Sequence, residues 1–376
     1  MTKGVRSGLF AERVRKIVQA IHRFVLIGGA IALFLPGRLN AQVFDVTNGN
    51  TSGPGSLAQA VSDANAFGLP ATIQIGVPTI NLQNSLEPVH DLQLNTTVGG
   101  SQIILPSSSG DPSVVSFGPG ALQFKVGDGV TLKNDTTTGI YANNVGMTLT
   151  VNGAVLTGGM ADGIQTAGSA SIIVGPTGII HSTGSAIREL GGIGGIVQIY
   201  IAQGGSVISD SQPAISVQDG SYRLVVAGSL SGTSAITGGI DLFSLELRPG
   251  FQINGIFPTA SGALILGGSG SGNFDVSRLG PSAQFLGFAT LAKNGDSTWT
   301  LIGTSNYNGT TTVNQGTLIV NGSLASSILT TVNASGTLGG NGTLGNTTIN
   351  GGALAPGNSI GTLTVQGSLV FTAASS

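Results

Sequence analysis

A group of charged residues in the middle of the chain has side chains that could carry out acid–base chemistry. Asp162, His181, Arg188, Glu189 and Asp210 follow one another in this segment. Cleavage of a polysaccharide needs carboxylates beside basic groups, often with calcium, because one group donates a proton and another accepts one. The alternative is a set of isolated solvated charges at turns, since 15 acidic residues spread thinly after residue 41 would scatter in this way. We therefore assign no catalytic residue.

The other chemical motifs are incomplete. The segment from Gly267 to Asp275 hints at a calcium-binding nonapeptide, but Gly272 stands where that motif needs an aspartate. His90 and His181 lack the spacing of metal ligands. We expect neither a metal nor a cofactor.

The composition excludes several classes of protein. The 376 residues include 62 glycines, 8% charged residues and no cysteine. The lack of cysteine excludes disulfides, zinc–thiolate sites and thiol nucleophiles, and the lack of a Gly-X-Y period excludes collagen. Aromatic residues make up 5% of the chain. We expect two of them, Trp299 and Tyr307, to pack inside or between structural repeats rather than to stack on a sugar.

Basic residues are concentrated at the N-terminus. Seven of the 14 lysines and arginines lie in residues 1–41, which leaves 7 basic and 15 acidic residues after them and a formal charge of −8. A chain this acidic, without a basic patch, is a poor binder of nucleic acid. We therefore expect no nucleic-acid partner.

The first 41 residues have the order of a secretory signal peptide. A basic stretch precedes an uninterrupted apolar run from Phe24 to Leu35, and a helix breaker and the small residue Ala41 follow. The run is shorter than the roughly 20 residues that span a bilayer. We predict export through the inner membrane and cleavage between Ala41 and Gln42. An N-terminal signal anchor is the alternative.

After residue 41, short β-branched runs alternate with clusters of glycine, asparagine, aspartate and serine. One segment, residues 56–66, has helical spacing instead, with Ser56 as a candidate N-cap. Its apolar stripe consists of Leu57, Ala60, Val61 and Ala64. An isolated amphipathic helix ahead of a long array of strands is typical of a cap that covers the first turn of a solenoid.

Two sequence markers recur with one long period. A small residue followed by Ala-Ile ends at Ile187, Ile215 and Ile236, and these sequence positions differ by 28 and 21. A glycine that follows a short strand recurs at intervals of 25, 27 and 23 along the sequence. These marker glycines are Gly153, Gly178, Gly205 and Gly228. Both sets of intervals fit one circuit of a three-sided β-helix.

The competing fold is an antiparallel sandwich, in which the Asn-Gly pairs would form hairpin turns. A sandwich does not explain the longer period. In a β-helix, we expect pairs such as Asn152-Gly153 and Asn254-Gly255 to supply positive φ angles at the corners. The predicted fold class is therefore all-β, a right-handed parallel β-helix with a short N-terminal capping helix.

Two parts of the chain resemble known families. The segment from Val46 to Leu82 resembles the opening of secreted parallel β-helix proteins of the pectate-lyase-like type. The segment from Ser297 to Gly322 is similar to the passenger-associated transport repeat of autotransporters, and residues 341–344 and 355–369 are similar to the turns that precede the translocator in that family. The residues that carry this second resemblance are Trp299, Gly303, Asn306, Tyr307, Gly309, Gly316, Leu318, Pro356, Gly357, Asn358, Ser359 and Gly361.

The autotransporter resemblance implies type V secretion, in which a C-terminal outer-membrane β-barrel helps to export the passenger. No series of ten-residue alternating strands typical of such a barrel is present before Ser376. Three expectations are open for the barrel translocator, which is the implied partner: the sequence is truncated before it, it is encoded separately, or the chain is a degraded relative of the family. The expected domains are a signal peptide (1–41), a β-helix cap (42–100), passenger rungs (101–290) and the passenger repeat with export-proximal rungs (291–376).

The sequence is compatible with three functions, because one solenoid scaffold can host many activities. The leading expectation is a non-enzymatic passenger, a stalk or adhesin at the bacterial cell surface, outer membrane-associated or extracellular, with a host-surface or polysaccharide ligand. The second is a secreted polysaccharide-degrading enzyme. The third is a self-associating protein of an extracellular matrix or biofilm.

Overall fold

The computed structural model describes residues 42–376 except residues 106–112, 119–121, 144–145, 192–195, 219–220, 239–240, 259–261, 358–360 and 373. The predicted signal peptide, including Ala41, lies outside these described residues. The described strands join into parallel ladders, as in a solenoid and unlike an antiparallel sandwich. The predicted all-β parallel β-helix is confirmed.

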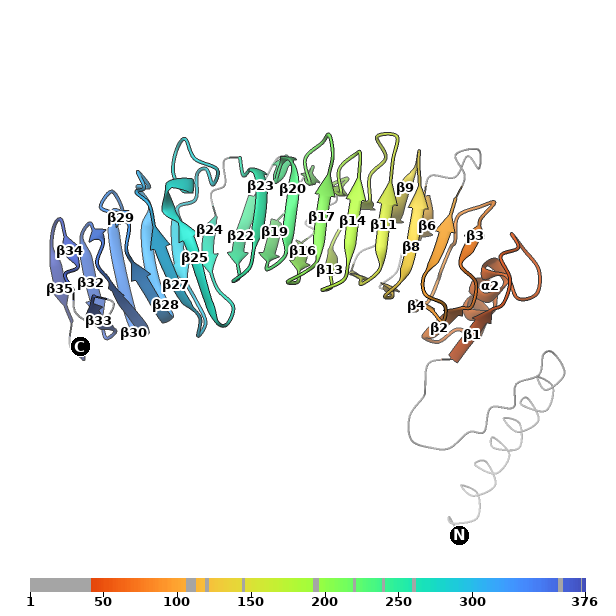
Figure 1. Cartoon of the computed structure of the whole chain (residues 1–376), viewed down its shortest axis with the longest axis horizontal. Helices are drawn as coiled ribbons and strands as arrows, with labels where there is room; N and C mark the ends of the chain where they lie inside the picture. The colour runs from red at the N-terminus through yellow and green to blue at the C-terminus, as the bar shows by residue number, and fades with distance from the viewer. Residues whose placement is uncertain are drawn as a thin grey trace, which may run out of the picture. The chain divides into compact units, whose positions relative to one another are not determined.

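The longest face of the solenoid takes one strand from each successive turn, so that strands from distant parts of the sequence lie side by side (Figure 1). Register partners Met147, Ala170, Val197 and Tyr222 follow one another at intervals of 23, 27 and 25 along the sequence. This spacing is the period that the sequence markers predicted. The strands of this face are β1 (Gln42–Val46), β2 (Ala71–Ile75), β4 (Leu92–Thr96), β7 (Gln123–Val126), β10 (Met147–Val151), β13 (Ala170–Val174), β16 (Ile196–Ile201), β19 (Ser221–Val226), β22 (Asp241–Leu247), β24 (Ala263–Leu266), β26 (Thr290–Lys293), β28 (Thr310–Val320), β30 (Leu329–Gly340), β32 (Thr347–Asn350) and β35 (Leu369–Phe371).

Two further faces complete each turn in the first two thirds of the described chain. The Ala-Ile markers align on the third face, where Ile187, Ile215 and Ile236 are register partners. The second face consists of β3 (Thr79–Asn81), β5 (Ser101–Ile104), β8 (Val130–Asn134), β11 (Ala154–Thr157), β14 (Ile179–Ser182), β17 (Ser206–Ser209), β20 (Ser229–Ser234) and β23 (Gln252–Ile256). The third consists of β6 (Ser113–Phe117), β9 (Thr138–Ala142), β12 (Ile164–Thr166), β15 (Ile187–Glu189), β18 (Ile215–Val217) and β21 (Ile236–Gly238).

The C-terminal turns are shorter and are built differently. Register partners Thr290, Thr310 and Leu329 follow one another at intervals of 20 and 19 along the sequence. The first part of β28 pairs with β26, whereas its second part pairs with β27, so one long strand covers two faces. The remaining elements of this region are β25 (Ser271–Asp275), the 3-10 helix η1 (Val276–Arg278), β27 (Thr298–Ile302), β29 (Ser323–Leu324), β31 (Thr343–Leu344), β33 (Ala353–Pro356) and β34 (Thr364–Val365).

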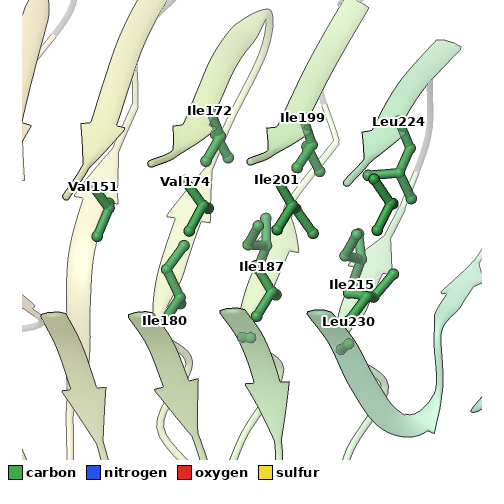
Figure 2. Close-up of a cluster of buried hydrophobic side chains, with 14 of the residues drawn as sticks. Val151, Ile172, Val174, Ile180, Ile187, Ile199, Ile201, Ile215, Leu224 and Leu230 are labelled. Atoms are coloured by element: carbon green, nitrogen blue, oxygen red, sulfur yellow. The ribbon is translucent and has the colours of Figure 1, made fainter. Parts of the chain in front are cut away.

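The core consists of columns of aliphatic side chains that run along the stack. Inward-facing positions alternate with outward-facing ones in each strand, as in the buried–intermediate pattern of β10 and β13. In Figure 2, Ile172, Ile199 and Leu224 occupy equivalent positions of successive turns, and side chains from the opposite strands point toward them. No single turn can bury such a face alone, so each turn depends on its neighbours.

The marker glycines lie at one corner of the solenoid, each directly before a strand of the second face. A Cβ atom on Gly178 would lie 2.0 Å from the carbonyl oxygen of Val151 in the preceding turn. The corner therefore needs glycine because successive turns approach closely there. The expectation of positive φ is confirmed for Gly255 of the second pair, whose φ is 100°, but not for Gly153 of the first. It is wrong for Asn152 and Asn254, since the non-glycine residues with positive φ in the described part are Met160 and Ala374.

The helix α2 (Leu57–Phe67) covers the N-terminal end of the described solenoid. Ser56 caps it, with its side-chain oxygen accepting from the Gln59 amide at 3.2 Å. The predicted stripe is buried, and the helix packs on β1 and β2. Phe67 also contacts Phe44 of β1 edge to face, at 6.2 Å between ring centroids. The predicted helix is confirmed, and its contacts are those of a cap.

Candidate functional site

Asp162 and Arg188 form an ion pair that links two neighbouring turns. Arg188 donates to both carboxylate oxygens of Asp162, at 2.6 and 3.2 Å. The carboxylate also accepts from the Ser185 amide and from the Gln165 side chain, each at 2.8 Å. Asp162 is 5% exposed. The carboxylate therefore links its own turn to the next one. Its removal would leave the donors of both turns unpaired, which is costly for buried groups.

The other three charged candidates do not converge on this pair. His181 and Asp210 form a separate exposed pair, at 2.8 Å between Nε2 and Oδ1, on neighbouring turns. Glu189 is buried and accepts from the Gln218 amide at 3.2 Å, whereas the preceding Arg188 occupies an outward position. The arrangement is two turn-to-turn links and one buried carboxylate, rather than two carboxylates that face one substrate.

The segment that resembles an incomplete calcium-binding nonapeptide has a packing role in the structure. Gly272 lies in β25, in register with Trp299 of β27, and a Cβ atom on Gly272 would lie 2.9 Å from the indole ring. Gly272 therefore leaves room for the tryptophan. Among the described residues, no group of three or more His, Cys, Asp or Glu side chains is placed to hold a metal ion.

Trp299 anchors the turn that begins the repeat motif. The side chain is fully buried, and its Nε1 donates to the Gly267 carbonyl oxygen at 3.1 Å. Phe251 lies 6.1 Å from the indole centroid and 6.4 Å from Phe274, which in turn lies 5.6 Å from Phe285. Most of the core elsewhere is aliphatic. The repeat therefore rests on an aromatic cluster whose members come from successive turns, and which buries a large apolar area between them.

Tyr307 closes the loop between β27 and β28. Its hydroxyl donates to the Thr310 carbonyl oxygen at 2.8 Å and lies 3.1 Å from that of Ala289. Its amide donates to Ser305 Oγ at 3.0 Å. Tyr307 is 2% exposed, and burial raises the pKa of its hydroxyl well above the ordinary value. The tyrosine therefore stays neutral and serves as a donor that fixes the loop.

Gly316 and Lys293 form the corner at which β28 bends. The Nζ atom of Lys293 donates to the carbonyl oxygens of Asn294, Gly295 and Gln315, at 2.9, 2.7 and 3.0 Å. Gln315 belongs to the next turn, so the buried ammonium joins two turns. Gly316 follows with φ of 74°. Lys293 was missed in the sequence, although it follows Leu291 by two residues and therefore shares the inward face of the strand.

Because the Lys293 ammonium is buried, we predict that the stability of the protein increases with pH in the alkaline range. Burial lowers its pKa to about 8 from the ordinary 10.5, against the raising effect of Asp296. Between these pH values the unfolded chain binds more protons than the folded chain, so the free energy of unfolding rises with pH across this window. Urea unfolding followed by circular dichroism at about pH 7.5, 9 and 10 measures the rise.

The variant Lys293→Met is expected to lose this rise and to be less stable at about pH 7.5, because three carbonyl oxygens lose their donor. Lys125→Met, which removes a lysine from an outward position of β7, is the matched control. An equal rise in wild type and in Lys293→Met would show that another group causes it.

The remaining motif residues lie at corners or between turns, except for Leu318 in the core. Gly303 follows β27, Asn306 lies against Gly280 of the preceding turn, and Leu318 is buried in β28. Gly309 is packed against Tyr307. Pro356 pairs with Gly340, Gly357 donates its amide to the Gly340 carbonyl oxygen at 2.8 Å, and Gly361 lies beside Asn341. Asn358 and Ser359 lie outside the described residues.

A ladder of asparagines, also missed in the sequence, follows the same corner as Lys293. Each side-chain amide donates to the asparagine oxygen of the preceding turn: Asn314 to Asn294 at 2.8 Å, Asn333 to Asn314 at 2.8 Å and Asn350 to Asn333 at 3.2 Å. Their nearly constant spacing is visible in the sequence, but asparagine is too common there for the pattern to stand out. The ladder fixes the register of successive turns.

Comparison with known proteins identifies one part of the chain. Residues 291–320 match the family model described as Passenger-associated-transport-repeat. No curated protein and no solved structure is similar enough to this chain to count as a match. The matched segment contains Lys293, Trp299, Tyr307 and Gly316. Together with the parallel β-solenoid, it supports an autotransporter passenger built on a β-helix, and the repeat family implies export to the cell surface or extracellular space.

Proposed function

We propose that this protein is a non-enzymatic autotransporter passenger, a β-helical stalk or adhesin that is displayed on the bacterial cell surface. Residues 1–41 direct its export through the inner membrane as a signal peptide cleaved before Gln42. Its partner in export is an outer-membrane barrel translocator, which carries it to the surface. The observation that carries the proposal is the match of residues 291–320 to the passenger repeat within a continuous parallel solenoid.

The geometry of the repeat agrees with a role in folding after export. From Ser297 to Ser376 the chain contains no charged side chain. Its turns are held by buried aromatic residues, the Lys293 corner and the asparagine ladder, all of which join one turn to the next. A solenoid is stabilised by interfaces between neighbouring turns, so a stable end can nucleate the folding of the rest. We propose that these turns fold first.

The enzyme alternative has less support. Asp162 is paired with Arg188, and His181 is paired with Asp210. No described feature places the two carboxylates around a common substrate. No helix among the described residues is long and apolar enough to cross a membrane. Turnover of a polysaccharide would favour the enzyme, and concentration-dependent assembly would favour the matrix protein.

Protease treatment of intact cells tests the surface location. In the bacterium that encodes the chain, added proteinase K is expected to digest most of it while a periplasmic marker survives. A variant without the apolar run Phe24–Leu35 is expected to stay in the cytoplasm and resist digestion, because the signal is lost. Wild-type chain that resists protease in intact cells, yet is digested in lysed cells, would contradict surface display.

A further inference from the structure

The outward side of the long face carries an unusual cluster of cations. The chain has seven lysines and arginines after residue 41. Two of these, Arg223 of β19 and Arg248 after β22, lie on either side of the carboxylate of Glu246. The Nε atom of Arg248 lies 2.7 Å from one carboxylate oxygen, and a nitrogen of Arg223 lies 3.7 Å from the other. Two cations around one anion leave a local charge of +1 in a chain that is strongly acidic after residue 41.

Arg248 is held in place from several sides. Its guanidinium lies over the Tyr200 ring at 5.3 Å from the centroid, two strands away from Glu246. Val225, the register partner of both Tyr200 and Glu246, is 8% exposed although it occupies an outward position. Since the side chain of Arg248 spans from Glu246 to Tyr200, it passes over this valine. The stacking on Tyr200 and the ion pair with Glu246 therefore hold the Arg248 guanidinium in one position.

Glu246 is built into the surface rather than solvated. Its side chain is 12% exposed. A Cβ atom on Gly267, in the next turn, would lie 2.7 Å from its carboxylate oxygen. A carboxylate this deeply placed needs a cation beside it, and Arg248 at hydrogen-bond distance supplies that cation. The second cation, Arg223, is not needed for this purpose.

Arg223 has N–H donors that are not used by the described residues. Its side chain is 51% exposed, and the described residues give it only the 3.7 Å approach to Glu246, which is too long for a hydrogen bond. A guanidinium has five N–H donors in a planar fork that fits a carboxylate. Beside it in register lies exposed Gln198, and half-exposed Tyr200 follows on the same strand. A fork donor, an amide and an aromatic hydroxyl thus share one surface.

We propose that Arg223, Tyr200 and Gln198, supported by Glu246 and Arg248, form a binding site for the carboxylate of an acidic saccharide. Arg223 pairs with the carboxylate, and the amide of Gln198 and the hydroxyl of Tyr200 meet sugar hydroxyls. A saccharide fits better than an acidic peptide because the Gln198 amide and the Tyr200 hydroxyl, beside Arg223, can each both donate and accept hydrogen bonds, as sugar hydroxyls do. The proposal rests on the proposed adhesive function and names the class of ligand that it would bind. The binding itself can be measured whether or not the protein is an adhesin.

The test is calorimetric titration of the purified full chain with a galacturonate oligomer, with a neutral glucose oligomer and a poly-glutamate peptide as alternative probes. We expect binding of the galacturonate oligomer that weakens with added salt, and weaker or no binding of the other two. Arg223→Gln is expected to reduce affinity about tenfold, because a charge-assisted bidentate contact is lost. Arg223→Lys is expected to lose part of it, since an ammonium lacks the planar fork.

Lys133→Gln is the matched control, because it removes the same charge from an outward position of β8, on a different face. It is expected to bind like the wild type. Circular dichroism checks that each variant is folded. Equal loss in Lys133→Gln and Arg223→Gln, equal binding of the peptide, or no binding of the galacturonate oligomer overturns the proposal. Because the measurement uses purified protein, its failure would leave the export proposal unaffected, and failure of the protease test would leave this site standing.

Discussion

Replacing Trp299 with alanine is expected to destabilise the turns of the repeat by about 3–5 kcal/mol, the usual cost of truncating a large buried aromatic side chain. Trp299 is fully buried, and its Nε1 is a hydrogen-bond donor to the Gly267 carbonyl oxygen. The space it leaves cannot be filled by the facing residue of β25, because that residue is Gly272. The cavity therefore persists. Hydrogen exchange of the β27 and β28 amides measures the loss locally, which matters because solenoids need not unfold in one step.

The same strand offers a control. Ile302, also in β27, is 46% exposed, so Ile302→Ala is expected to change stability by less than about 0.5 kcal/mol. A double variant then tests the contact itself. Gly272→Ala is expected to be costly in the wild type, where the added methyl group would lie 2.9 Å from the indole, and tolerated in Trp299→Ala. Equal costs of Gly272→Ala in both backgrounds would contradict this account of the glycine.

The period of the fold could be predicted from the sequence because parallel in-register strands repeat similar residues at equivalent positions. Ile187, Ile215 and Ile236 are visible as a marker in the sequence for the same reason that they form one column in the core. The helix could be predicted because its stripe and its cap are local. In each case, the information lies within one turn or recurs once in every turn.

The links between turns could not be predicted in this way. Asp162 and Arg188 are 26 residues apart, and only the register reveals that they are partners. Asn314 and Lys293 act through groups on neighbouring turns, so nothing adjacent in the sequence shows their role. Asparagine was expected at corners for its backbone. In the C-terminal turns it is used for its side chain, which extends a ladder from one turn to the next.

The shape of the repeat corner leads to the second large effect. Gly316→Ala is expected to destabilise the C-terminal turns. The loss is expected to be larger than for an alanine substitution at a glycine that has a similar φ but open space around it. Part of the cost is the backbone: φ is 74°, which costs an L-residue roughly 1–2 kcal/mol. The rest is a clash, since the added Cβ would lie 2.4 Å from the Gly295 oxygen and 2.7 Å from that of Ser297.

Gly270→Ala separates these two contributions. Gly270 has φ of 80° and nothing within 4 Å of an added Cβ atom, so its substitution carries the backbone cost alone. We expect Gly316→Ala to exceed it by about 1–3 kcal/mol, as for overpacking of a filled site, in denaturant unfolding and in the protease resistance of the C-terminal turns. The added methyl group would also lie 2.8 Å from Lys293 Nζ and displace it from its carbonyl oxygens. If the two substitutions cost the same, the corner is looser than this packing implies, and the added methyl group does not displace Lys293 from its carbonyl oxygens.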